Sequence, residues 1–404
     1  MTIDLSSITF TDQADIVPES GEHDIVNTYE ANTLAGNDTI TGIGGPFDFF
    51  NPSESPFGII NSGTLNTAEG KDIITGTGGS DGIINSGTLN TAEGKDIITG
   101  TGDYFDGIRN SGTLNTAEGS DIITGNGIRV GIYNSGTFNT AEGSDVITGT
   151  GGKSSGIFIA DGSTFDTGDG HDSISGEGRT GIYNGSLTFN TGDGNDTIAG
   201  TGSDYGIENK GTINTGNGKD TIIAINDGLY GFGLSNFSTI DTGDGDDIIT
   251  ASGDIDNGGT IDTGYGDDTI TGSGALYNTD NIDTDYGDDI ITVIGGFYNA
   301  GTINTGNGAD SIIANGGFLG TGSVFLGNGK DYLNGFGTGN FNGGKNQDTL
   351  ELTSGSYIVG ISGTTVSFTN NGVIMETSEF EKLIAGSATY LFTSLTDDQT
   401  IVVP

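Results

Sequence analysis

Aspartates that recur in one fixed local sequence are the residues of this chain best suited to chemistry. Residues 191–198 read Thr-Gly-Asp-Gly-Asn-Asp-Thr-Ile, in which Asp196 is the repeated aspartate, and fourteen such copies can be aligned. Glycines at alternate positions let the backbone take positive φ and turn its carbonyl oxygens to one side. If two such turns stack, carbonyl and carboxylate oxygens face each other, which suits a hard cation with about six to eight oxygen ligands. The motif therefore predicts calcium between successive turns.

The predicted calcium ligands form two sets, according to the glycines in front of each aspartate. The better set is Asp172, Asp196, Asp220, Asp247, Asp268, Asp289, Asp310 and Asp331, with the turn glycines Gly192, Gly194, Gly216, Gly218, Gly243, Gly245, Gly264, Gly266, Gly306 and Gly308. The weaker set is Asp38, Asp72, Asp96, Asp121, Asp145 and Asp348.

Four early copies read Thr-Ala-Glu-Gly-x-Asp, so that an alanine replaces a glycine in the turn. If this position needs φ above zero, an alanine is strained there. The glutamate that follows either adds a carboxylate ligand or faces solvent. The early half of the repeat is therefore expected to bind metal less well. The alanines are Ala68, Ala92, Ala117 and Ala141, and the glutamates are Glu69, Glu93, Glu118 and Glu142.

Calcium fits this oxygen-rich motif better than other common metals do. The chain has no cysteine, and its two histidines, His23 and His171, are far apart in sequence, so zinc lacks its usual ligands. Magnesium keeps its waters and demands a stricter octahedron. A Gly-Asp turn that closes a corner without metal is the alternative. Against it, carboxylates roughly 5 Å apart repel each other by about 3 kcal/mol per pair at an effective dielectric constant near 20.

The spacing of the copies predicts a parallel β-solenoid. The interval is 21 residues between Asp247 and Asp268 and 27 residues between Asp145 and Asp172, which fits one coil per copy. An Ile or Leu stands two residues after every aligned Asp, and the residue between them varies, as in a strand with one buried face. Two further segments, Gly-Ile-x-Asn and Gly-Thr-apolar-Asn/Asp-Thr, give three short strands per coil. The asparagines of the first segment, such as Asn61, Asn85 and Asn110, are expected to form a hydrogen-bonded ladder.

The repeat resembles the calcium-binding nonapeptide G-G-x-G-x-D-x-U-x of the RTX (repeats-in-toxin, haemolysin-type) family. Residues 191–199 match it with Thr191 in place of the first glycine, and residues 343–350 keep the first two glycines but have Asn346 at the third. The resemblance implies a right-handed parallel β-roll with Ca²⁺ between turns. Here one corner per coil carries the motif, so a single column of sites is expected. The fold class is thus all-β: a right-handed parallel β-solenoid of about 14 coils with a small C-terminal β-rich cap.

The amino-acid composition excludes several classes of binding partner. The chain has 404 residues, 55 Asp and Glu against 11 Lys and Arg, and a formal net charge of -44. Such a chain repels nucleic acid and anionic membranes and attracts divalent cations. No apolar run approaches the roughly 18 residues of a transmembrane helix, so no transmembrane segment is expected. Contact with a cell surface or a polysaccharide is compatible with this composition.

The two ends are expected to differ from the repeat at 31–350. Residues 1–30 read as an N-terminal cap with degenerate strands at 15–17 and 24–26. Residues 351–404 read as a C-terminal cap with a type I′ hairpin about Asn371-Gly372 and a short helix over 378–385. The acidic-then-apolar end, 397–404, is similar to the uncleaved C-terminal signals of type I export, which implies an extracellular, secreted protein.

Three functions follow from these patterns. The first is a calcium-binding secreted or cell-surface repeat protein without enzymatic activity. The second is ice or surface binding by the outward Thr-x-Asn rows, such as Thr64 with Asn66 and Thr88 with Asn90. The third is a polysaccharide-acting β-helix enzyme. An enzyme would need paired carboxylates beside a positioned basic or aromatic group, whereas here the carboxylates repeat uniformly and no coil stands out.

Overall fold

The computed structural model describes residues 2–18, 22–47 and 56–404. These residues form β-strands and tight turns, with two short 3₁₀ turns, η1 (Leu5–Ser7) and η2 (Phe392–Ser394), and no α-helix among them. The chain divides into two compact units, of which unit 1 comprises residues 1–217 and 223–231 and unit 2 comprises residues 218–222 and 232–404. Both units are parallel β-solenoid, with about 13 turns in the chain, which confirms the predicted fold class.

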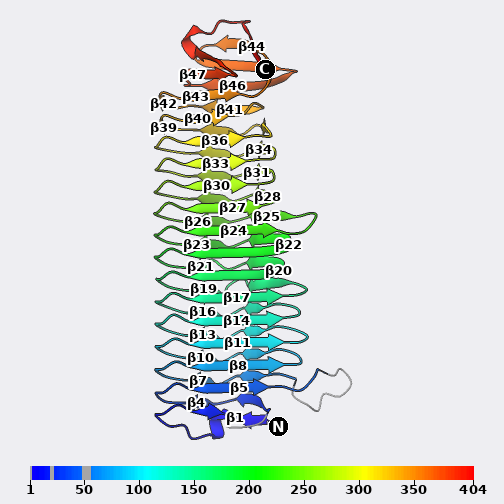
Figure 1. Cartoon of the computed structure of the whole chain (residues 1–404), viewed down its shortest axis with the longest axis vertical. Helices are drawn as coiled ribbons and strands as arrows, with labels where there is room; N and C mark the ends of the chain where they lie inside the picture. Colours follow the sequence, from blue (N-terminus) through cyan, green and yellow to red (C-terminus); the bar gives the residue numbers. More distant parts are fainter. Residues whose placement is uncertain (1, 19–21, 48–55) are drawn as a thin grey trace. The chain divides into compact units, whose positions relative to one another are not determined.

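Unit 1 has three columns of strands, each formed by equivalent strands of successive coils (Figure 1). The first column, which starts after the aligned aspartates, contains β2 (Ile16–Val17), β5 (Thr39–Ile43), β8 (Ile73–Gly78), β11 (Ile97–Gly102), β14 (Ile122–Gly127) and β17 (Val146–Gly151). The second contains β1 (Thr2–Asp4), β3 (Asp24–Asn27), β6 (Ile59–Asn61), β9 (Ile83–Asn85), β12 (Ile108–Asn110), β15 (Ile132–Asn134) and β18 (Ser155–Ile159). The long strands β20 (Ser173–Asn184) and β22 (Thr197–Asn209) run through both of these columns. The third contains β4 (Glu30–Asn32), β7 (Thr64–Asn66), β10 (Thr88–Asn90), β13 (Thr113–Asn115), β16 (Thr137–Asn139), β19 (Thr164–Asp166), β21 (Thr188–Asn190) and β23 (Thr212–Asn214).

Unit 2 repeats the same three columns and ends in a cap. Strand β24 (Thr221–Asn226) has residues in both units. The first column contains β27 (Ile248–Ser252), β30 (Thr269–Gly272), β33 (Ile290–Val293), β36 (Ser311–Ala314), β40 (Tyr332–Asn334), β43 (Thr349–Leu352) and β47 (Lys382–Ala385). The second contains β25 (Phe232–Asn236), β28 (Asp254–Asn257), β31 (Leu276–Asn278), β34 (Phe297–Asn299) and β37 (Phe318–Leu319). The third contains β26 (Thr239–Asp241), β29 (Thr260–Asp262), β32 (Asn281–Asp283), β35 (Thr302–Asn304), β38 (Ser323–Phe325) and β41 (Gly339–Asn342), and β39 (Asn328–Gly329) pairs with β42 (Lys345–Asn346) at the aspartate corner.

The core of each unit is narrow and built from one apolar side chain per strand. The Ile or Leu two residues after each aligned Asp is at most 1% exposed in every coil, as Ile74 and Ile270 show. Its neighbours on either side face outward, so the alternation predicted from the sequence is confirmed. Burying such a side chain contributes about 2 to 3 kcal/mol. The stability of a coil therefore depends on a few buried side chains and on the hydrogen bonds between coils.

The asparagine ladder is present in both units. Asn61 Nδ2 donates to Asn85 Oδ1 over 2.8 Å and to the carbonyl oxygen of Thr88 over 2.7 Å, and Asn257 does the same to Asn278. The side chains are fully buried, so these bonds satisfy polar groups that water does not reach. In unit 1 the ladder is interrupted at β18, where Ile159 stands opposite Asn134. The predicted structural role of these asparagines is confirmed.

The C-terminal cap confirms one prediction and corrects another. Strands β45 (Thr365–Asn370) and β46 (Val373–Ser378) form an antiparallel hairpin with φ of 50° at Asn371 and 81° at Gly372, as a type I′ turn requires. The predicted helix over 378–385 is wrong. β46 continues to Ser378, and β47 instead pairs in parallel with β43, so that Leu383 lies opposite Leu350 in the core. The open edge of the last coil offers backbone partners that a helix would leave unused. The remaining cap strands are β44 (Gly355–Ser362), β48 (Ala388–Leu391) and β49 (Thr400–Val403), and the last of these holds most of the apolar end predicted as an export signal.

Candidate metal site and the aspartate columns

The aligned aspartates lie inside the corner at which each first-column strand begins. Their side chains are at most 2% exposed. At least twelve of the fourteen carboxylates accept a hydrogen bond from the backbone N–H of the equivalent aspartate one coil earlier: the N–H of Asp268, for example, donates to Asp289 Oδ1 over 2.8 Å. We call these rows the aspartate columns. The same bond recurs, at 2.7–3.0 Å, from Asp38 through Asp72, Asp96, Asp121, Asp145 and Asp172 to Asp196 in unit 1, and from Asp220 through Asp247, Asp268, Asp289, Asp310 and Asp331 to Asp348 in unit 2.

In most of these residues the second carboxylate oxygen, Oδ2, is buried and has no hydrogen-bond partner within the part of the chain that the structure describes. Asp268 Oδ2 has no hydrogen-bond partner among the described residues. The Thr263 hydroxyl lies close enough to favour the charged form of Asp268, yet Thr263 Oγ1 is itself buried without a well-aligned partner. A buried oxygen of this kind calls for a proton or a cation. The same oxygen is free in Asp38, Asp72, Asp96, Asp121, Asp145, Asp172, Asp247, Asp289, Asp310, Asp331 and Asp348.

Burial raises the pKa of most of these carboxyl groups. Burial raises the pKa of Asp268 to about 7, and the neighbouring carboxylates of Asp289 and Asp247 add to the shift. The backbone N–H donated to the carboxylate acts in the opposite direction and only partly offsets burial. The pKa is also raised to about 7 in Asp96, Asp172, Asp310 and Asp331 and to about 6 in Asp72, Asp145, Asp247, Asp289 and Asp348, and burial raises it in Asp38 and Asp121 as well.

The turn before each aspartate has a left-handed residue at its second position. Glycine fills it with φ of 81° at Gly192 and 80° at Gly264. Alanine fills it in the early coils, with φ of 56° at both Ala92 and Ala117, so the predicted strain is confirmed. Gly216, Gly243 and Gly306 take φ of 83°, 85° and 83° at this position, and Ala68 and Ala141 take 57° and 59°.

Glycine is required at the fourth turn position because successive turns touch there. A Cβ on Gly194 would lie 1.4 Å from the carbonyl oxygen of Gly170, and a Cβ on Gly266 would lie 1.7 Å from that of Gly245. The same applies to Gly245 and Gly308, whose Cβ would lie 1.4 Å and 1.6 Å from a carbonyl oxygen, and Gly218 likewise has φ above zero. Each turn therefore packs its carbonyl directly against the backbone of the next turn.

This packing decides what the corner can hold. The carbonyl oxygen of the third turn residue accepts a backbone N–H, as Gly266 donates to Tyr286 over 2.7 Å, and Oδ1 of each aspartate is also occupied. Besides these occupied oxygens, the aspartate Oδ2 atom remains for a cation or a proton in most coils. Among the described residues no group of three or more acidic, His or Cys side chains is arranged to hold a metal ion. Calcium, with about six to eight oxygen ligands, would have to recruit further oxygens from the turn backbone or from water. Calcium binding by these residues stays a prediction.

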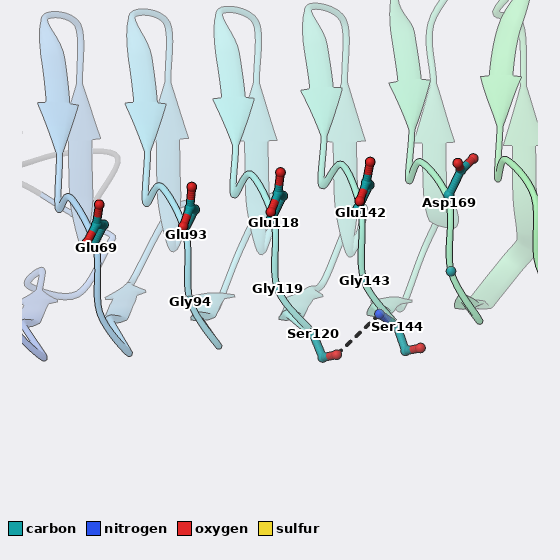
Figure 2. Close-up of a pocket in the computed structure, with 11 residues that line it drawn as sticks. Glu69, Glu93, Gly94, Glu118, Gly119, Ser120, Glu142, Gly143, Ser144 and Asp169 are labelled. Carbon is teal, nitrogen blue, oxygen red and sulfur yellow. Dashed lines mark hydrogen bonds between the residues drawn. The ribbon is translucent and has the colours of Figure 1, made fainter.

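A second acidic row lies on the outside of the same corner. Glu69, Glu93, Glu118 and Glu142, followed by Asp169, line an open groove of about 800 Å³ in unit 1. Figure 2 shows their carboxylates side by side and pointing the same way, away from the turns that carry them. The glutamates are exposed, and the buried aspartates do not line this groove. The structure thus shows the glutamate side chains facing solvent, and a ligand role for them stays a prediction.

One charged cluster was not found from the sequence. Asp106, which is fully buried, accepts Arg129 Nε on Oδ1 over 2.8 Å, and its Oδ2 contacts the other end of the same guanidinium. The Asp106 N–H donates to Asp81 Oδ1 over 3.1 Å. Arg129 also lies 5.9 Å from the ring centre of Tyr133. Asp81, Asp106 and Arg129 lie in loops outside the repeated motif, whereas Tyr133 belongs to β15. The sequence does contain a signal for this cluster, because Arg129 is one of only 11 Lys and Arg residues in the chain.

No protein-family model matches the chain, and no curated protein is significantly similar to it.

Proposed function

We propose that this chain is a calcium-binding repeat protein of the RTX type that is secreted or displayed on a cell surface and has no enzymatic activity. The observation that carries the proposal is the buried, unused Oδ2 atom repeated in the aspartate columns of both units. The uniform repetition of the carboxylates, without a coil set apart from the others, supports a binding role over catalysis.

Electrostatics argue that the columns need a counter-charge at neutral pH. Equivalent atoms of neighbouring coils lie about 4.8 Å apart. Two ionised carboxylates at that separation repel by about 3 kcal/mol at an effective dielectric constant near 20. Protons neutralise the columns below their raised pKa values of about 6 to 7, but well above pH 7 a cation has to do so. One divalent cation can neutralise the carboxylates of two adjacent coils. The net charge of -44 also concentrates such ions around the chain.

The location and partners belong to the same proposal. Calcium is abundant outside cells, where a calcium-dependent fold would be stable. The chain has no excess of basic residues for nucleic acid. Within the described residues, no helix is both long and apolar enough to cross a bilayer. We infer that contacts with a cell surface or a polysaccharide, where they occur, use calcium bridges or uncharged faces.

The test replaces one column residue by its neutral isostere. Asp268→Asn keeps Oδ1 as the acceptor for the Asp247 N–H, which donates over 2.8 Å, but removes the charge. At pH 8 we expect added Ca²⁺ to raise the melting temperature of the parent, and to raise that of Asp268→Asn by less. Without calcium, the variant should melt at or above the parent, because a buried charge is gone.

Two results would count against calcium binding here. One is a parent whose β-sheet circular dichroism and melting temperature at pH 8 are the same in Ca²⁺ and in chelator. The other is an Asp268→Asn variant that keeps the full calcium response. Mg²⁺ at the same concentration serves as the control for simple charge screening, since it fits an irregular oxygen site less well.

A further inference from the structure

One outward sheet face of unit 1 carries no charge, although the chain as a whole is strongly acidic. It is the outer side of four first-column strands, β8, β11, β14 and β17. These strands pair in register, so that Thr75 lies opposite Thr99, Thr99 opposite Thr124, and Thr124 opposite Thr148. The alternate residues, such as Ile98 and Gly100, are buried. We call this surface the threonine face.

The threonine face is a regular array of methyl and hydroxyl groups. Each strand contributes three outward side chains, in the order Ile or Val, Thr, and Thr or Asn. None of the twelve is acidic, basic or aromatic, and all are partly or well exposed: Ile73, Thr75, Thr77, Ile97, Thr99, Thr101, Ile122, Thr124, Asn126, Val146, Thr148 and Thr150. The array continues uncharged onto β5, with Thr39, Thr41 and Ile43 outward, and ends at β20, where Glu177 stands opposite Thr150.

The spacing of this array is set by the sheet. Equivalent threonines of adjacent strands are about 4.8 Å apart, and the two threonines of one strand are about 6.7 Å apart, which is twice the rise per residue. Threonine is stiff at χ1, so the hydroxyl groups are held in few orientations. A ligand that uses the whole face must itself be periodic in two directions, flat and uncharged.

The outward row that the sequence suggested for such binding is less suitable. In the third column the asparagines bond to one another: Asn115 Nδ2 donates to Asn90 Oδ1 over 2.7 Å, and Asn139 Nδ2 to Asn115 Oδ1 over 2.9 Å. Their amides are thus committed along the sheet. Asp166 places a carboxylate in the same row, opposite Asn139. The third column of unit 1 therefore lacks the neutrality of the threonine face, and its asparagine amides are already bonded to one another.

We propose that the threonine face binds ice. Its two spacings lie close to distances between oxygen atoms in the ice lattice, so the hydroxyl groups can take lattice positions while the methyl groups occupy the hollows between waters. The lack of charge matters, because an ionised side chain would hold its own hydration shell and disrupt such a layer. A crystalline polysaccharide is the other flat periodic ligand, but the face has no aromatic ring on which a sugar could stack.

The test is thermal hysteresis together with ice-recrystallisation inhibition, at saturating Ca²⁺. The parent is expected to show both activities. Thr99→Tyr combined with Thr124→Tyr places two large rings at the centre of the face and should abolish both. The matched control, Thr88→Tyr with Thr113→Tyr, puts the same rings on the outward side of β10 and β13 and should leave both unchanged.

Circular dichroism and melting temperature, measured on all three proteins, distinguish loss of binding from loss of fold. If the first variant is unfolded, Thr99→Val with Thr124→Val takes its place and should lower the hysteresis through loss of the hydroxyls alone. A folded parent without hysteresis overturns the proposal, as does equal loss in the control, or binding to crystalline cellulose or chitin but not to ice. None of these readouts measures calcium binding, so failure here and failure of the proposed function are separable.

Discussion

At the scale of single residues, the left-handed turn position gives a prediction about stability. Ala117 holds φ of 56°, a conformation that costs an L-residue about 1 to 2 kcal/mol relative to glycine. Glycine loses more backbone entropy on folding, which offsets part of that gain. Ala117→Gly should therefore stabilise unit 1 by up to about 1 kcal/mol, measured as a shift of the urea midpoint.

The reverse substitution is the control for this effect. Gly192→Ala puts a Cβ at φ of 81° and 2.1 Å from the carbonyl oxygen of Gly168, so it should destabilise the same unit. If both substitutions move the midpoint in the same direction, backbone strain does not distinguish the early coils from the later ones.

At the scale of elements, the buried asparagine ladder should contribute more to stability than the exposed asparagine row of the third column. Asn110 accepts from Asn85 Nδ2 and donates to Asn134 Oδ1, each over 2.8 Å, and is fully buried. Asn110→Ala removes three hydrogen bonds, namely those with Asn85 Nδ2, with Asn134 Oδ1 and with the carbonyl oxygen of Thr137, each of which contributes about 0.5 to 1.5 kcal/mol. We expect the melting temperature of this variant to fall by many degrees.

The matched change removes an asparagine of the outward row. Asn90→Ala takes away the acceptor of Asn115, but both side chains are partly exposed and water can replace the bond. Its cost should stay below about 1 kcal/mol. Equal melting temperatures for the two variants would show that the buried ladder is not a main source of stability.

Some of these elements can be predicted from the sequence alone, and others cannot. The apolar residue two places after each aspartate predicts the buried strands, because the period of two is the same in every coil. The Asn371-Gly372 pair predicts the type I′ turn, since both residues tolerate positive φ. The helix that the sequence predicts over 378–385 is wrong because local propensity does not take account of the open sheet edge at β43. Likewise, the spacing of the aspartates predicts that they lie at one corner of each coil. It does not predict that their Oδ1 atoms accept hydrogen bonds from the neighbouring coil.

At the scale of the molecule, the acids fall into two populations that respond differently to pH. The exposed acids of the turns, such as Asp267 and Asp288, face solvent, and their charges are screened by salt. The aspartate columns are buried and form continuous rows through each unit. Stability as a function of pH should therefore be governed by the columns.

The sign of that dependence follows from the raised pKa values. An unfolded aspartate has a pKa near about 3.9, whereas burial raises the pKa of Asp268 and Asp310 to about 7 in the folded chain. The folded state thus binds the proton more tightly. Its stabilisation is fully present below pH of about 4 and is lost as the pH rises through about 6 to 7. In chelator, the melting temperature should fall between pH 5 and pH 8, and added Ca²⁺ should reduce the fall.

Paired variants can assign this fall to the columns. Asp268→Asn with Asp289→Asn removes two buried carboxyls and keeps both Oδ1 acceptors, so the melting temperature should change less between pH 5 and pH 8 than in the parent. Asp267→Asn with Asp288→Asn removes the same charge from the adjacent exposed residues and likewise keeps the backbone bonds made by their Oδ1 atoms. This control should retain most of the parent's dependence on pH, because burial, the main cause of the raised pKa values, is unchanged. If the exposed pair flattens the curve and the buried pair does not, general repulsion within an acidic chain, rather than the buried columns, sets the response to pH.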